Sequence, residues 1–120
     1  MQLSELLSTM DTLLGENGCP WDKEQTHESL RPYMLEECNE VIDAINRQNM
    51  DDLREELGDV LLQVVFHAKI AEKAGQFTIE DVISGIVNKL VSRHSHIYGS
   101  DIATTPEEVL DLWQKNKKSE

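Results

Sequence analysis

The sequence predicts an all-helical protein, an antiparallel bundle of four helices with a short extra helix at its C-terminal end. Apolar residues recur at helical spacing in several separate segments, and no segment alternates apolar and polar residues as a half-buried strand would. Aromatic residues make up only 5% of the chain, which is low for a sheet protein. The breaks between the periodic segments are short, and short connections favour antiparallel neighbours.

The first expected helix spans 3–14, where leucine and methionine share one helical face. Gly15 and the Asn-Gly pair that follows it are expected to end this helix. A polar loop is expected over 16–28. It contains Trp21, for which packing against the bundle is favoured over contact with a ligand.

The second and third helices carry most of the acidic residues of interest. The second is expected over 29–47, and Pro32 is tolerated in its first turn because its missing N–H needs no partner there. The third is expected to begin at Asn49 or Asp51 and to end at Gly75, a residue suited to a left-handed helix cap. It is the most apolar of the expected helices.

The last part of the chain is expected to hold a fourth helix and a short fifth one. Thr78 has the character of a helix start, and the basic segment 93–96 suits the C-terminal end of the fourth helix. Thr105, followed by proline and by Glu108, is a strong start signal for the fifth. A charged tail is expected over 115–120.

Composition limits the possible partners. The formal net charge of −12 argues against a nucleic-acid polymer or an anionic membrane, but a bound divalent cation would still allow a small phosphorylated ligand.

No apolar run is long enough for a membrane span, and no signal peptide is expected. Two cysteines do not make a disulfide framework, so reduced thiols and a cytoplasmic location are expected. The 120 residues are expected to form a single domain, 1–120.

Two pairs of carboxylates stand out. Glu37 and Glu40 lie three residues apart on the second helix, as do Glu56 and Asp59 on the third, so each pair shares a helix face. If the two helices fold back on each other, four carboxylates converge. At an effective dielectric near 20, two charges about 4 Å apart repel by roughly 4 kcal/mol. Such a cluster must be protonated, spread apart or neutralised by a cation, and a solvated acidic face is the alternative.

The surroundings of Asp59 favour a site. Aspartate is a poor helix former, and Gly58 beside it costs about 1 kcal/mol in a helix interior but would let a ligand approach closely. Carboxylates without a nearby cysteine or histidine suit Mg²⁺ or Mn²⁺ better than Zn²⁺. Metal-assisted attack of water on a phosphoanhydride is then the expected reaction class. Lys89 and Arg93, four residues apart, would suit phosphates, although two solvated side chains are the alternative.

These residues lie in a pattern that resembles the MazG family of all-helical nucleoside triphosphate pyrophosphohydrolases. The family pattern Glu-Glu-x-x-Glu is matched at 36–40, and the following Glu-x-x-Asp is matched at 56–59. Cys-Pro-Trp-Asp at 19–22 is also similar, as is Arg-His-Ser-His-Ile-Tyr-Gly at 93–99, where Ser95 replaces the usual proline. The likeness covers nearly the whole chain.

The resemblance implies a MazG fold, a homodimer or higher homo-oligomer, and Mg²⁺-dependent cleavage of nucleoside triphosphates into monophosphate and pyrophosphate, with Mn²⁺ as a possible substitute. Carried over by position, it implies metal ligands at Glu37, Glu40, Glu56 and Asp59, catalytic support from Glu36, Glu37 and Glu55, phosphate binding by Lys89 and Arg93, and base contact by Trp21 or Trp113. Many relatives carry two such domains in tandem, and this chain most resembles their N-terminal copy. In some of these relatives the N-terminal copy is inactive, although the intact motif of this chain favours activity. A regulatory dimer that binds nucleotide or metal with little turnover is therefore the alternative.

Overall fold

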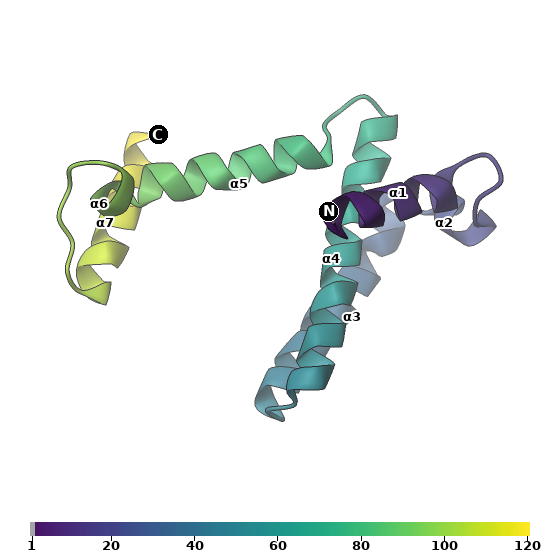
Figure 1. Ribbon diagram of the computed structural model, residues 1–120, viewed down its shortest axis with the longest axis horizontal. Helices are drawn as coiled ribbons and strands as arrows, with labels where there is room; N and C mark the ends of the chain where they lie inside the picture. The colour runs from purple at the N-terminus through teal and green to yellow at the C-terminus, as the bar shows by residue number, and fades with distance from the viewer. Residues whose placement is uncertain (1) are drawn as a thin grey trace. The chain divides into compact units, whose positions relative to one another are not determined.

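The computed structural model describes residues 2–120, and the regular structure of this range is entirely helical (Figure 1). The all-helical prediction is therefore confirmed. The chain divides into two compact units, Met1–Ile79 and Glu80–Glu120. The helices are α1 (Gln2–Leu14), α2 (Pro20–Glu24), α3 (His27–Asn46), α4 (Met50–Lys73), α5 (Ile79–Arg93), α6 (Ser95–Tyr98) and α7 (Pro106–Ser119).

The framework of the first unit is a helical hairpin made by α3 and α4, which run side by side (Figure 1). Only three residues connect them, and the middle one, Gln48, has a left-handed φ of 54°. Asn49 caps α4, because its side-chain oxygen accepts a hydrogen bond from the N–H of Asp52 at 3.1 Å. Arg47 pairs with Asp43 at 3.1 Å and with Asp52 at 2.9 Å, so it links the two helices at the turn.

The hydrophobic core of the first unit is small and lies where α1, α3 and α4 meet. Met10 and Leu30 are 1% exposed and Val65 is fully buried. Phe66, Ala68 and Ile79 belong to the same cluster, and leucines of α1 pack around it. The apolar stripe expected on the third helix thus supplies most of the core, and it fixes the C-terminal half of α4 against α1 and the start of α3.

The segment expected as a loop over 16–28 is more ordered than predicted. The residues of α2 form a short helix with a proline at its start, a position where the missing N–H costs nothing. α3 begins at His27, two residues earlier than expected, because Thr26 and Ser29 form a reciprocal cap. The Ser29 N–H donates to Thr26 Oγ1 at 3.1 Å, and the Thr26 N–H donates to Ser29 Oγ at 2.8 Å.

The second unit contains nearly all of α5, followed by α6 and α7. The cap expected at Thr105 is present, since its Oγ1 accepts from the N–H of Glu108 at 3.2 Å. α7 continues to Ser119, so the prediction of a separate charged tail over 115–120 was wrong. Lys117 and Lys118 lie in the last turn of α7, where positive side chains interact favourably with the helix dipole. This interaction favours continuation of the helix through the charged segment. Among the described residues, no helix is both long enough and apolar enough to span a membrane.

Candidate metal centre

Four carboxylates from facing helices meet in the first unit. Glu37 and Glu40 come from α3, and Glu56 and Asp59 come from α4. Each can offer one oxygen, and these oxygens all lie within 4.8 Å of one another. All four residues are partly buried. The convergence expected from their spacing is thus present in the structure.

The hairpin explains why these residues meet. Glu40 lies six residues before the end of α3, and Glu56 lies six residues after the start of α4. Glu37 and Asp59 each lie nine residues from the same two ends. Because both helices rise by the same amount per residue, equal distances from the turn place residues opposite each other. Glu40 therefore faces Glu56, and Glu37 faces Asp59.

Two carboxyl groups of the cluster, those of Glu37 and Glu56, have raised pKa values. Burial raises the pKa of Glu37, and the charges of Asp59 and Glu40 raise it further. The pKa of Glu56 is raised to about 7, mainly by a hydrogen bond shared with Glu40, then by burial and by neighbouring negative charges. Such a bond between carboxyl groups exists only while one of them holds a proton. Without a cation, the cluster therefore keeps a proton near neutral pH.

Two oxygen atoms of the cluster have no hydrogen-bond partner although they are buried, namely Oε2 of Glu37 and Oε2 of Glu56. A buried carboxylate oxygen without a donor is costly, so these atoms call for a positive partner. Oxygen ligands alone are what hard divalent cations such as Mg²⁺ prefer. The donor set and its two unpartnered oxygens therefore fit a cation of this kind.

The raised pKa of Glu56 predicts how the metal-free chain responds to pH. The unfolded chain loses this proton near its ordinary pKa of 4.5 and the folded chain near 7, so this group lowers the stability of the metal-free protein as pH rises across that window. A cation needs the deprotonated carboxylates. We expect Mg²⁺ to raise the melting temperature more at about pH 8 than at about pH 5.5. Thermal melts with and without Mg²⁺ test this, and equal gains at both pH values would contradict it.

The other two acidic residues of the family pattern lie beside the cluster and are exposed. The negative charge of Glu36 contributes to the raised pKa of Glu37, and that of Glu55 contributes to the raised pKa of Glu56. Glu36 and Glu40 also line an open surface cavity of about 500 Å³ on α3. One side of the acidic cluster is thus accessible to a ligand.

An aromatic pair lies one helical turn from the cluster. Trp21 of α2 contacts Tyr33 of α3 edge to face, with ring centroids 5.6 Å apart, and 48% of Trp21 remains exposed. Tyr33 precedes Glu37 by four residues, so both side chains lie on the same face of α3. The sequence interpretation did not include Tyr33. Its spacing of four and seven residues from Glu37 and Glu40 was the signal that could have identified it.

The remaining predicted site residues belong to the second unit, where two of them meet. The guanidinium of Arg93 lies 5.0 Å from the ring centroid of Trp113 and pairs with Glu120 at 3.0 Å. This pairing lowers the pKa of Glu120. Lys89 is exposed and lines a shallow cavity together with Glu120. Arg93 and Trp113 thus form a local cluster within this unit.

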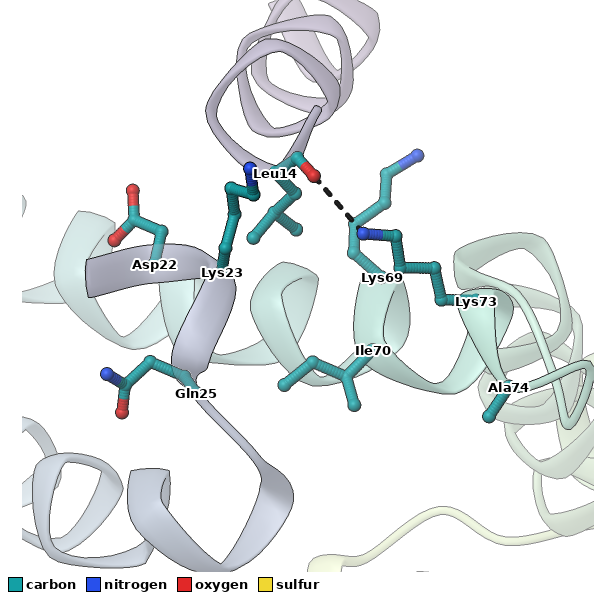
Figure 2. A pocket seen from close by; sticks show the side chains of 8 residues that line it. All are labelled: Leu14, Asp22, Lys23, Gln25, Lys69, Ile70, Lys73 and Ala74. Carbon is teal, nitrogen blue, oxygen red and sulfur yellow. Dashed lines mark hydrogen bonds between the residues drawn. The ribbon is translucent and has the colours of Figure 1, made fainter. Parts of the chain in front are cut away.

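A different cavity, of about 320 Å³, lies near the C-terminal end of α4 and is lined by three lysines (Figure 2). Two of these lysines bind backbone carbonyls at or just after the end of α1: Lys73 donates to Leu14 at 3.2 Å, and Lys23 to Glu16 at 3.1 Å. Lys69 pairs with Asp11 at 2.7 Å and with Glu72 at 3.3 Å. α1 has no basic residue in its own last turn, where a positive charge would interact favourably with the helix dipole. The lysines of α2 and α4 supply positive charge at this end instead. None of the four clustered carboxylates lines this cavity.

Comparison with known proteins identifies the family. The model of the MazG nucleotide pyrophosphohydrolase domain matches residues 25–98, a range that includes all four clustered carboxylates. The chain belongs to the MazG family. A solved MazG-related protein from Thermotoga maritima agrees with the structure at a TM-score of 0.79 and 26% identity, covering 96% of this chain and 98% of that one.

Curated relatives are closer in sequence to this MazG chain but longer. It is 59% identical to the nucleoside triphosphate pyrophosphohydrolase/pyrophosphatase MazG of Thermotoga maritima, over 79% of this chain and 37% of that protein. It is 48% identical to the nucleoside triphosphate pyrophosphohydrolase of Escherichia coli K12, over 99% of this chain and 46% of that protein. It is 50% identical to the uncharacterized protein YabN of Bacillus subtilis, over 99% of this chain and 24% of that protein. The MazG chain thus spans 24–46% of the length of these three relatives.

Proposed function

We propose that this MazG chain is a Mg²⁺-dependent nucleoside triphosphate pyrophosphohydrolase. It would convert ribo- or deoxyribonucleoside triphosphates, standard or aberrant, with one water molecule into the monophosphate and pyrophosphate. The observation that carries the proposal is the set of four carboxylate oxygens within 4.8 Å of one another, drawn from two facing helices. The names of the Thermotoga and Escherichia relatives support the substrate class.

The four clustered carboxylates would hold the cation, with Mn²⁺ as a possible substitute for Mg²⁺. When bound, the cation neutralises phosphate charge and makes a coordinated water more acidic. Glu37 would support catalysis as well as bind the cation, since it belongs to the cluster and one of its two oxygens is buried without a partner. Glu36 and Glu55 would orient that water or stabilise the ligands, and their positions beside Glu37 and Glu56 support this role.

Substrate contacts are proposed for Lys89, Arg93, Trp21 and Trp113. Lys89 and Arg93 would bind phosphates, and Arg93 would first have to release Glu120. Trp21 or Trp113 would contact the base. The aromatic neighbour of Trp21, Tyr33, lies one turn from Glu37, which supports the first choice, whereas the contact of Trp113 with Arg93 supports the second. Alanine at each of these positions should raise KM, and an unchanged KM would exclude that residue as a substrate contact.

A homodimer or higher homo-oligomer is proposed from the apolar side chains that α5 leaves exposed. Each of them is 38–48% exposed: Val82, Ile83, Ile86, Val87, Leu90 and Val91. A contiguous apolar surface of this kind is usual for an interface between proteins. The family match from 25 to 98 crosses the boundary between the two units, which supports treating 1–120 as one domain. Sedimentation at the mass of a single 13.7 kDa chain would contradict the oligomer.

We also propose that the protein works in the cytoplasm. Cys19 and Cys38 are both free thiols in the structure, as suits a reducing compartment. Fractionation of the source cells tests this location. Recovery of the chain from an extracytoplasmic fraction with oxidised thiols would contradict it.

A panel of nucleoside triphosphates, assayed for pyrophosphate with and without Mg²⁺, tests the proposed activity. We expect pyrophosphate and monophosphate in equal amounts, because one bond is broken in each turnover. A chelator should stop the release, since the carboxylates alone supply no positive charge. If no nucleotide yields pyrophosphate with either Mg²⁺ or Mn²⁺, the proposal fails. Saturable nucleotide binding without product would then favour the regulatory alternative.

A further inference from the structure

Gln63 of α4 is a buried polar residue that the sequence interpretation did not include. Its side chain is only 7% exposed, and its carbonyl oxygen Oε1 is buried without a hydrogen-bond partner. A buried acceptor left without a donor destabilises the fold, and Leu or Met would fill the same space without that cost. The presence of an amide in this position therefore calls for a partner.

The helical register places Gln63 next to the acidic cluster. Gln63 follows Asp59 by four residues and Glu56 by seven, so the three side chains share one face of α4. Side chains in a helix lean toward its N-terminal end, which directs the amide of Gln63 toward the turn that carries Asp59. Gln63 thus belongs to the face of the helix from which Glu56 and Asp59 meet α3.

The chemistry of a hydrated cation identifies a partner. A bound cation needs the carboxylates in their ionised form, and ionised carboxylates are acceptors only, so the cation-bound cluster itself cannot donate to Gln63. A cation held by carboxylates usually keeps several waters. A water bound to a cation has its lone pair engaged and presents O–H donors outward, so it needs acceptors around it. Gln63 supplies a buried acceptor one helical turn from the ligands.

We infer that Gln63 is a positioning residue of the cation site, whose Oε1 accepts a hydrogen bond from a water on the bound cation. The inference rests on the proposed function, because it requires the four carboxylates to hold a cation. It adds a residue outside the acidic motif to the site. Gln63 would orient the water from the α4 side. Its Oε1 would gain a hydrogen-bond donor only when the cation is bound.

The test uses Mn²⁺ as the probe, with calorimetry for affinity and water-proton relaxation for the waters on the metal. Gln63→Met removes the acceptor at nearly constant volume, and Gln63→Leu removes it with a different shape. We expect both variants to bind Mn²⁺ about tenfold more weakly than the parent and to change the water-proton relaxation rate. A loss of this size is typical when a residue that hydrogen-bonds a metal ligand is removed. Gln63→Glu keeps an acceptor oxygen and should retain parental affinity or exceed it.

Gln76→Met is the matched control, because Gln76 is exposed beyond the end of α4 and the same substitution there should leave Mn²⁺ binding unchanged. Without metal, Gln63→Met should melt no lower than the parent, since it removes a buried acceptor that has no partner. Parental affinity and relaxation in both apolar variants would overturn the inference while leaving the proposed function intact. A parent protein that binds no Mn²⁺ would instead overturn the cation site itself.

Discussion

Asp59→Asn is expected to lower Mg²⁺-dependent pyrophosphate release by at least about a hundredfold while the protein stays folded. Asparagine keeps the size of aspartate but offers one neutral oxygen in place of a charged pair. Asp59 faces Glu37 across the α3–α4 hairpin, so the cation would lose the ligand opposite Glu37. Pyrophosphate release at saturating nucleotide, measured over a range of Mg²⁺ concentrations, gives the effect.

The same substitution should stabilise the metal-free protein. The charge of Asp59 helps to raise the pKa of both Glu37 and Glu56, so its removal relieves repulsion within the cluster. Thermal melts should therefore show a higher melting temperature without Mg²⁺ and a smaller gain with it. Asp51→Asn is the control, since Asp51 lies on the same helix with its side chain 90% exposed. If Asp59→Asn keeps more than about a tenth of the parental rate, Asp59 is not a ligand needed for turnover.

Leu30→Ala is expected to lower the free energy of unfolding by about 2–5 kcal/mol, because it leaves a cavity in a small core. Leu30 is 1% exposed and belongs to the core cluster with Met10 and Val65. This core fixes the start of α3 against α1 and the C-terminal half of α4. A domain of this size has a total stability of about 5–15 kcal/mol, so the loss is a large share of it.

Urea denaturation measures this loss through the shift in midpoint at constant slope. Leu110→Ala is the control, since Leu110 is 67% exposed on α7 and its truncation should cost less than about 0.5 kcal/mol. A loss below about 1 kcal/mol for Leu30→Ala would mean that the core rearranges around the cavity.

Local signals predicted the helix boundaries where a cap or a special backbone conformation defines them. Thr105 caps α7 as expected, and Gly75, which lies just beyond α4, has the left-handed φ of 69° that only glycine adopts without strain. The predictions failed where the signal was weaker. The reciprocal cap of Thr26 with Ser29 uses serine where glutamate is usual, so the start of α3 was placed too late.

The sequence by itself determined the chemistry of the candidate site. Helical periodicity is a local property, so a spacing of three residues was enough to place Glu37 with Glu40 and Glu56 with Asp59 on shared faces. The residue types alone predicted a hard cation, and the flanking pattern indicated the family, which the family match confirmed.

Only the tertiary structure decided which acidic side chains are partly buried and which stay exposed to solvent. Glu37 and Glu56 each have a buried oxygen, whereas their sequence neighbours Glu36 and Glu55 remain exposed. The difference depends on the opposite helix, since the short α3–α4 turn sets which residues face each other. The burial of Gln63 has the same origin. Burial comes from atoms that are distant in sequence, and a pattern read along a single helix does not contain them.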